Sequence, residues 1–285
     1  MLVTWVVKWS PVMQFAGNVF RLCWIGICAL AMLSQTRFVL GLPLAPDLLD
    51  GYVLGSTVFA YGFTHSDRRL KTVSWLAGLF GGACYALSAW PLLSGSPPAQ
   101  RTPEYWPMTA LLPLLLWLLY YGLQRPGTAG LRGVPAAKPV VVGLTWAIVT
   151  VLLPLPEERW SEASIMFSGR AIFIFALALA YDLSDLVYDR RHGLSTLAGR
   201  VGASGTFRFM DAALVLAFLC YCTNFFLHVF PLYATAALIA SLVFSAWWLR
   251  FLLRKSISTA RQKLLIDALM PLQLLLIWLA SFLEI

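Results

Sequence analysis

Three aspartates lie close together at the end of an apolar stretch. Asp182, Asp185 and Asp189 are spaced three and then four residues apart. On an α-helix this spacing puts all three carboxylates on one face over two turns. Like charges on one face repel, so the arrangement is stable when a cation lies between them or when some are protonated. Because Mg²⁺ takes oxygen ligands and is commonly completed by substrate phosphates, the spacing is compatible with a magnesium diphosphate site.

The same spacing has a second interpretation. A solvated loop could begin at Asp185 and form salt bridges with Arg190 and Arg191, which follow the third aspartate directly. Spacing alone does not separate this interpretation from the magnesium site. The elements around the aspartates must therefore be considered next.

The chain has the composition of a membrane protein. Of its 285 residues, 60% are hydrophobic and only 12% are charged, which is too little polar surface for a soluble domain. A spanning helix needs about 20 mostly apolar residues. The candidate segments are residues 11–34, 46–65, 72–93, 105–123, 139–154, 165–187, 207–230, 232–249 and 264–285. We therefore expect an all-α integral membrane protein, with residues 1–285 forming a single polytopic membrane domain.

The basic residues predict the orientation. Most of the 21 Lys and Arg residues fall at the N-terminus and in every second loop, and basic loops stay on the cytoplasmic side. This predicts a cytoplasmic N-terminus and an external C-terminus. The charge of +8 is spread over short loops, so it indicates a lipid bilayer surface and no nucleic acid. Without a cleavable signal or transit pattern, we expect the inner membrane of a bacterium.

The residues around the three aspartates resemble a known motif. The run from Tyr181 to Gly202 reads YDLSDLVYDRRHGLSTLAGRVG. This resembles the second aspartate-rich motif of the UbiA superfamily of intramembrane prenyltransferases, approximately DxxDxxxDxxxGxxTLPxxxG. The matching residues are Asp182, Asp185, Asp189, Gly193, Thr196, Leu197 and Gly202, with Ala198 where Pro is usual. The resemblance implies nine transmembrane helices around a central, lipid-accessible cavity.

The resemblance also implies roles for these residues. Asp182, Asp185 and Asp189 would be the catalytic residues that bind Mg²⁺. Arg190 and Arg191 would contact the oxygens of an isoprenyl diphosphate. Metal ions and basic side chains stabilise the departing diphosphate while an allylic cation forms.

The first motif of the family, close to NDxxDxxxD, is degenerate in this chain. In the corresponding residues 59–71 only Asp67 is acidic. We therefore do not expect a complete second metal site. The neighbouring basic side chains could contact the diphosphate directly, or they could be ordinary anchors at the membrane surface. These residues are His65, Arg68, Arg69 and Lys71.

Other polar residues in the predicted spans add candidates. The stretch 131–138, which ends in Lys138 and leads into Trp146, is similar to a divergent branch of the superfamily and implies that Lys138 binds the diphosphate. Gln14, Asn18 and Arg21 share one helical face, which could bind a head group or pack against another helix.

Two further charged residues have structural interpretations. We expect Arg170 to reach the outer membrane surface with its long side chain. Asp267 follows Lys263 by four residues, which favours an ion pair between them over a role as a catalytic base.

The sequence thus predicts a membrane prenyltransferase that ionises an isoprenyl diphosphate with Mg²⁺ and transfers the prenyl group to an unidentified acceptor. One alternative is a terpene cyclase of the same superfamily, which needs no acceptor. The other is a non-catalytic lipid-binding or transport protein on the same scaffold, as the degenerate first motif suggests.

Overall fold

The computed structural model describes residues 11–63, 67–94, 109–121, 134–191, 196–255 and 257–283, and these residues form helices with no strand among them. The helices are α1 (Pro11–Val39), α2 (Leu48–Phe63), α3 (Arg68–Ser94), α5 (Leu111–Tyr121), α6 (Ala137–Ala147), a π-helical turn (Ile148–Leu152), a 3₁₀ turn (Glu157–Arg159), α7 (Trp160–Ser184), α8 (Leu186–Arg191), α9 (Leu197–Phe226), α10 (Leu232–Arg254), α11 (Thr259–Asp267) and α12 (Leu269–Ser281).

The structure has the helix lengths of a multi-pass membrane protein. Six segments are long and apolar enough to cross a bilayer, namely Phe15–Val39, Arg68–Trp90, Glu157–Ser184, Leu197–Phe226, Leu232–Arg254 and Thr259–Ser281. Two apolar helices, Leu111–Tyr120 and Ala137–Leu152, are shorter. Each segment predicted from the sequence overlaps at least one helix, and the last of them, 264–285, covers part of α11 and the whole of α12. Nine crossings and their orientation stay a prediction.

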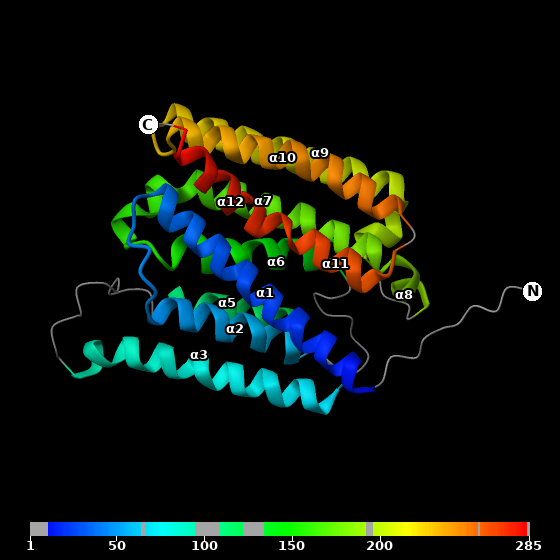
Figure 1. Cartoon of the computed structure of the whole chain (residues 1–285), viewed down its shortest axis with the longest axis horizontal. Coiled ribbons are helices and arrows are strands. Elements are labelled where there is room, and N and C mark those ends of the chain that lie inside the picture. The colour runs from blue at the N-terminus through cyan, green and yellow to red at the C-terminus, as the bar shows by residue number, and fades with distance from the viewer. Residues whose placement is uncertain are drawn as a thin grey trace, which may run out of the picture.

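The helices run roughly parallel to one long axis (Figure 1). Helices α9 and α10 lie along one side of the bundle and α3 along the opposite side, with α1, α6, α7 and α12 between them. Helix α7 is central, because it contacts α6, α9, α10 and α11. The start of α1 lies at the same end as α8 and α11, and the end of α12 lies at the other. We call the former the α8 end.

Close packing of α2 on α3 depends on glycine. A Cβ atom at Gly55 would lie 2.5 Å from the Ala77 carbonyl oxygen and 2.7 Å from the Gly81 backbone nitrogen. Backbone atoms cannot move aside as flexible side chains do. The absent side chain therefore sets the separation of the two helices, as small residues do in membrane helix pairs.

An ion-pair cluster joins α1 to α2 at the end opposite α8. The Arg37 guanidinium donates to Asp47 and Asp50, with 2.9 Å between the paired atoms. Its side chain is only 5% exposed. Since a buried charge is costly unless it is paired, this cluster holds the α1–α2 connection in one arrangement.

The prediction that Arg170 reaches the membrane surface was wrong. Its side chain is 1% exposed, and its guanidinium donates to the Met32 carbonyl oxygen and the Thr150 hydroxyl, both at 3.0 Å. Thr150 belongs to the π-helical turn Ile148–Leu152, whose extra residue changes the direction of the side chains that follow. Helix α1 and the π-helical turn thus supply partners that spacing along α7 alone could not reveal.

Helix α9 begins in the aspartate-rich motif and bends within it. The Thr196 hydroxyl caps the helix by accepting from the Gly199 backbone nitrogen at 3.2 Å. At Gly202 the backbone has φ +70° and ψ 179°, a conformation open essentially to glycine alone. Two of the motif matches, Thr196 and Gly202, therefore shape the chain that follows the aspartates.

Candidate active site

The three aspartates share one face, as their spacing predicted. Helix α7 ends at Ser184, but the Asp189 backbone nitrogen still donates to the Asp185 carbonyl oxygen at 2.9 Å, so the helical path continues into α8. Asp182 is fully buried, Asp189 is 6% exposed and Asp185 is half-buried. The solvated loop considered as the second interpretation is therefore absent between Asp185 and Asp189.

Two lysines from other helices neutralise part of this face. The Lys138 ammonium of α6 lies 2.5 Å from Asp182 Oδ1, and the Lys263 ammonium of α11 lies 2.6 Å from Asp185 Oδ2. The salt bridge of Lys263 is thus to Asp185, and the predicted pair with Asp267 was wrong. Both carboxylates are within reach of the flexible Lys263 side chain. The packing of α11 on α7 brings Asp185 into position to form the salt bridge.

Neighbouring charges and burial act in opposite directions on the pKa of the third aspartate, Asp189. Burial raises the pKa of the Asp189 carboxyl, the Lys138 ammonium lowers it, and the carboxylates of Asp185 and Asp182 raise it further. One buried oxygen of Asp189, Oδ2, and the Oδ2 of Asp182 have no hydrogen-bond partner within the described part of the chain. Uncommitted buried carboxylate oxygens are the ligands that a hard cation takes.

These residues fit a magnesium ion that is completed by other ligands. No three His, Cys, Asp or Glu side chains in the described ranges are grouped closely enough to hold a metal by themselves. Mg²⁺ typically keeps several waters and binds through one or two carboxylates plus substrate phosphates. The carboxylates of Asp182, Asp185 and Asp189, which we call the aspartate face, could supply one or two ligands of this kind and leave the others to water and substrate.

A cavity of about 190 Å³ opens beside the charged residues. We call it the inner cavity. Lys138, Tyr181 and Asp267 contribute its polar side chains near the aspartate face, and apolar side chains line most of the remainder. The apolar residues come from six helices and include Ile25, Ala60, Trp117, Val142, Trp146, Ile174, Leu177 and Met270.

A second, larger cavity of about 400 Å³ adjoins the first. We call it the apolar cavity. The two share lining residues, namely Ala60, Tyr61, Trp117, Thr145 and Trp146. At this junction the Trp146 indole donates to the Tyr61 hydroxyl at 3.2 Å. The charged end of the inner cavity therefore leads into a long apolar space between α2, α3, α5 and α6.

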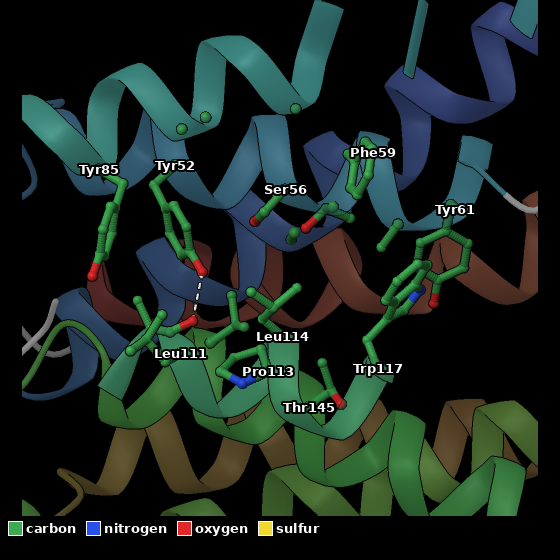
Figure 2. A pocket seen from close by; sticks show the side chains of 18 of the residues that line it. Tyr52, Ser56, Phe59, Tyr61, Tyr85, Leu111, Pro113, Leu114, Trp117 and Thr145 are labelled. Atoms are coloured by element: carbon green, nitrogen blue, oxygen red, sulfur yellow. Dashed lines mark hydrogen bonds between the residues drawn. The ribbon is translucent and has the colours of Figure 1, made fainter. Parts of the chain in front are cut away.

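Figure 2 shows the side chains that line the apolar cavity. Tyr52 and Tyr85 lie side by side at one end of the view, with ring centroids 5.9 Å apart, and Tyr61 and Trp117 lie at the other. The Tyr52 hydroxyl donates to the Ala110 carbonyl oxygen at 2.9 Å. This hydrogen bond ties α2 to the start of α5 at the end farthest from the junction.

Several residues predicted from the sequence lie elsewhere. Arg190 and Arg191 on α8 are exposed, as are Arg68, Arg69 and Lys71 at the start of α3. None of these five side chains lines either cavity.

Three further candidates have other outcomes. The Asp67 carboxylate accepts from the Arg69 backbone nitrogen at 2.9 Å, so it caps the start of α3. His65 lies outside the described residues. On α1, Asn18 is half-buried and does not line either cavity, whereas Arg21 from the same predicted face lies near Asp267.

Long apolar helices, an acidic face paired with lysines and adjoining apolar cavities together define a multi-pass integral membrane protein with a charged pocket next to apolar space. The model of the UbiA prenyltransferase family matches residues 128–277. The chain belongs to the UbiA prenyltransferase family. The matched residues include Lys138, the three aspartates and Asp267.

A solved structure of a digeranylgeranylglyceryl phosphate synthase has a similar fold. The match covers 93% of this chain and 95% of that chain, with a TM-score of 0.56 and 14% sequence identity. At this identity the likeness establishes the fold. The comparison with curated proteins finds no match.

Proposed function

We propose that this chain is a membrane enzyme that transfers the prenyl group of an isoprenyl diphosphate to an acceptor, with Mg²⁺ as cofactor. The observation that carries the proposal is the position of Lys138, which is paired with Asp182 and also lines the inner cavity. A charged end that opens into apolar space suits a molecule with an anionic head and a hydrocarbon tail. An isoprenyl diphosphate is such a molecule, and family membership supports this substrate class.

The head group would bind at the aspartate face. Asp185 and Asp189, one helical turn apart, would hold Mg²⁺, with Asp182 on the preceding turn. The bound ion supplies positive charge for the diphosphate oxygens. Lys138 and Lys263 donate charge-assisted hydrogen bonds to the same oxygens and stabilise the charge that develops as the C1–O bond breaks.

The prenyl chain would extend through the inner cavity into the apolar cavity. Tyr61, Trp117 and Trp146 line the junction between the cavities. Aromatic faces attract cations, so these side chains can stabilise the allylic cation after ionisation. The surrounding apolar walls limit the access of water to the cation.

The exposed basic residues have a different role in this proposal. The location of Arg68, Arg69 and Lys71 on the surface supports their function as anchors at the cytoplasmic membrane boundary. The same rule supports a cytoplasmic position for the aspartate face, where diphosphates from the cytoplasm would reach it.

The test is an assay of the purified protein in lipid nanodiscs with geranylgeranyl diphosphate and Mg²⁺. We expect diphosphate release that requires Mg²⁺ and stops when the ion is removed with EDTA. D185A should abolish release. The matched control is D211N, which removes an acidic group that pairs with Arg250 on α10 and should leave release unchanged.

Product analysis separates the alternatives. A product whose mass is that of the prenyl group plus an added acceptor supports transfer, whereas a hydrocarbon formed from the donor alone supports cyclisation. Tight binding of the diphosphate without its release would support the non-catalytic alternative and refute the proposed enzyme.

A further inference from the structure

We propose that the Asp267 carboxylate is the catalytic proton acceptor at the inner cavity, a role that rests on the proposed function. The sequence favoured a structural role for this residue, as the ion-pair partner of Lys263. The structure pairs Lys263 with Asp185 instead. The carboxylate of Asp267 is thereby left for another role.

The position of Asp267 supports this role. Asp267 is 7% exposed, and it lines the inner cavity together with Lys138 and Tyr181. Among the described residues that line either cavity, it is the sole carboxylate. On α11 it follows Lys263 by one turn, so it lies one turn away from the Lys263–Asp185 ion pair of the head-group site.

The surroundings place polar partners from other helices around this carboxylate. The Tyr181 hydroxyl of α7, which donates to the Lys263 carbonyl oxygen at 3.4 Å, lies beside it in the inner cavity. Arg21 on α1 and Lys263 on its own helix bring positive charge close to it. A charged base in an apolar cavity needs such partners, and here three helices supply them.

A proline explains why the chain presents Asp267 at this point. Pro271 has no backbone N–H, so the Asp267 carbonyl oxygen lacks its usual helical partner four residues later. The Cys28 thiol of α1 lies 3.5 Å from this oxygen as a donor. Helix α11 ends at Asp267 and α12 begins at Leu269, and α1 holds the break in place.

The proposed step conserves atoms and charge. The C1–O bond of the donor breaks, and its electron pair leaves with the diphosphate. In transfer, a nucleophilic atom of the acceptor bonds to C1 and its proton moves to Asp267. Without an acceptor, the cation loses a proton from the carbon next to its charged centre to Asp267, and the C–H electron pair becomes a C=C bond.

The acceptor-free reaction gives a direct test. Protein in nanodiscs is incubated with geranylgeranyl diphosphate and Mg²⁺, and the products are separated into hydrocarbons, which form by proton loss, and alcohols, which form by capture of water. We expect D267N to lower the ratio of hydrocarbon to alcohol about tenfold or more, since a positioned base contributes roughly 10²–10⁴ in rate. D267E should restore part of the ratio.

Diphosphate release distinguishes this proposal from the proposed function. If the wild type releases no diphosphate, the proposed function fails and this inference fails with it. If the wild type forms no hydrocarbon, or if D267N leaves the ratio unchanged, only the inference is overturned. It is also overturned if D267N and D267E lose diphosphate release as completely as hydrocarbon formation, because the residue would then serve ionisation or folding.

Discussion

The Lys138 ammonium lies 2.5 Å from Oδ1 of Asp182, a carboxylate whose side chain has no exposed surface. The two residues come from α6 and α7, which pack against each other. Burying a lone carboxylate is costly, and a paired ammonium offsets that cost. The ion pair therefore stabilises the contact of the two helices as well as orienting the lysine toward the inner cavity.

This relationship predicts that K138M destabilises the protein by about 3 kcal/mol, the lower end of the range for breaking a buried pair, because Lys138 itself is 38% exposed. The variant leaves the Asp182 charge buried without its partner. The measurement is the midpoint of thermal unfolding in detergent, which should fall by several degrees.

The double variant K138M/D182N is the control for this prediction. The asparagine amide at position 182 carries no charge, so we expect the double variant to regain most of the lost stability. A double variant as unstable as K138M would show that the carboxylate charge does not cause the loss.

Lys263 is expected to affect substrate binding more than stability. The carboxylate that loses its partner here, Asp185, keeps 21% of its side-chain surface exposed, whereas Asp182 keeps none, so leaving it unpaired costs less folding free energy. K263M should weaken the binding of geranylgeranyl diphosphate roughly 10- to 100-fold, the loss expected for one charge-assisted hydrogen bond. The measurement is the KM for this donor, together with the unfolding midpoint.

The matched variant for Lys263 is R261M. Arg261 is an exposed cation on the same helix, so its removal should leave the KM unchanged. Equal effects of the two variants would mean that helix charge in general, and not the contact of Lys263, controls binding.

Gly202 is expected to be necessary for the bend in α9. An alanine there would adopt φ +70° and ψ 179°, at a cost of about 1–3 kcal/mol. We expect G202A to lower the unfolding midpoint, although its Cβ would meet no atom within 4 Å. G17A is the control, since Gly17 has equal space in a regular part of α1; an equal response of both variants would argue against backbone strain.

The apolar cavity is expected to limit the length of the prenyl chain. Gly82 lines it, and a Cβ there would meet no atom within 4 Å, so G82F can place a ring in the cavity. Activity should then shift from geranylgeranyl toward geranyl diphosphate, measured as the ratio of kcat/KM for the two donors. Ala83 lies next along α3 and does not line the cavity, so A83F should keep the original ratio.

Local patterns in the sequence were sufficient for several features. The spacing of Asp182, Asp185 and Asp189 predicted one acidic face because helical periodicity depends only on positions along the chain. Apolar segments predicted the helices for a similar reason, since a spanning helix satisfies its own backbone hydrogen bonds. The helix ends were less accurate. Helix α9 begins ten residues before the predicted segment, because Thr196 caps it within the polar motif.

Charge partners could not be predicted from the sequence in the same way. Lys263 lies four residues from Asp267 yet pairs with Asp185, which is far away in the chain. Arg170 was expected at the surface, but it is buried among partners on α1 and the π-helical turn. Such pairings depend on which helices pack together, and no local spacing encodes that choice.

By itself, then, the sequence determined that this protein is helical, embedded in a membrane and equipped with a face of three carboxylates. Only the tertiary structure decided that Lys138 and Lys263 pair with that face, that Asp267 lines the adjoining cavity, and that the basic residues of α8 and α3 face outward. The physical reason is that periodicity acts within one helix, whereas a site for a head group and its tail forms where several helices pack side by side.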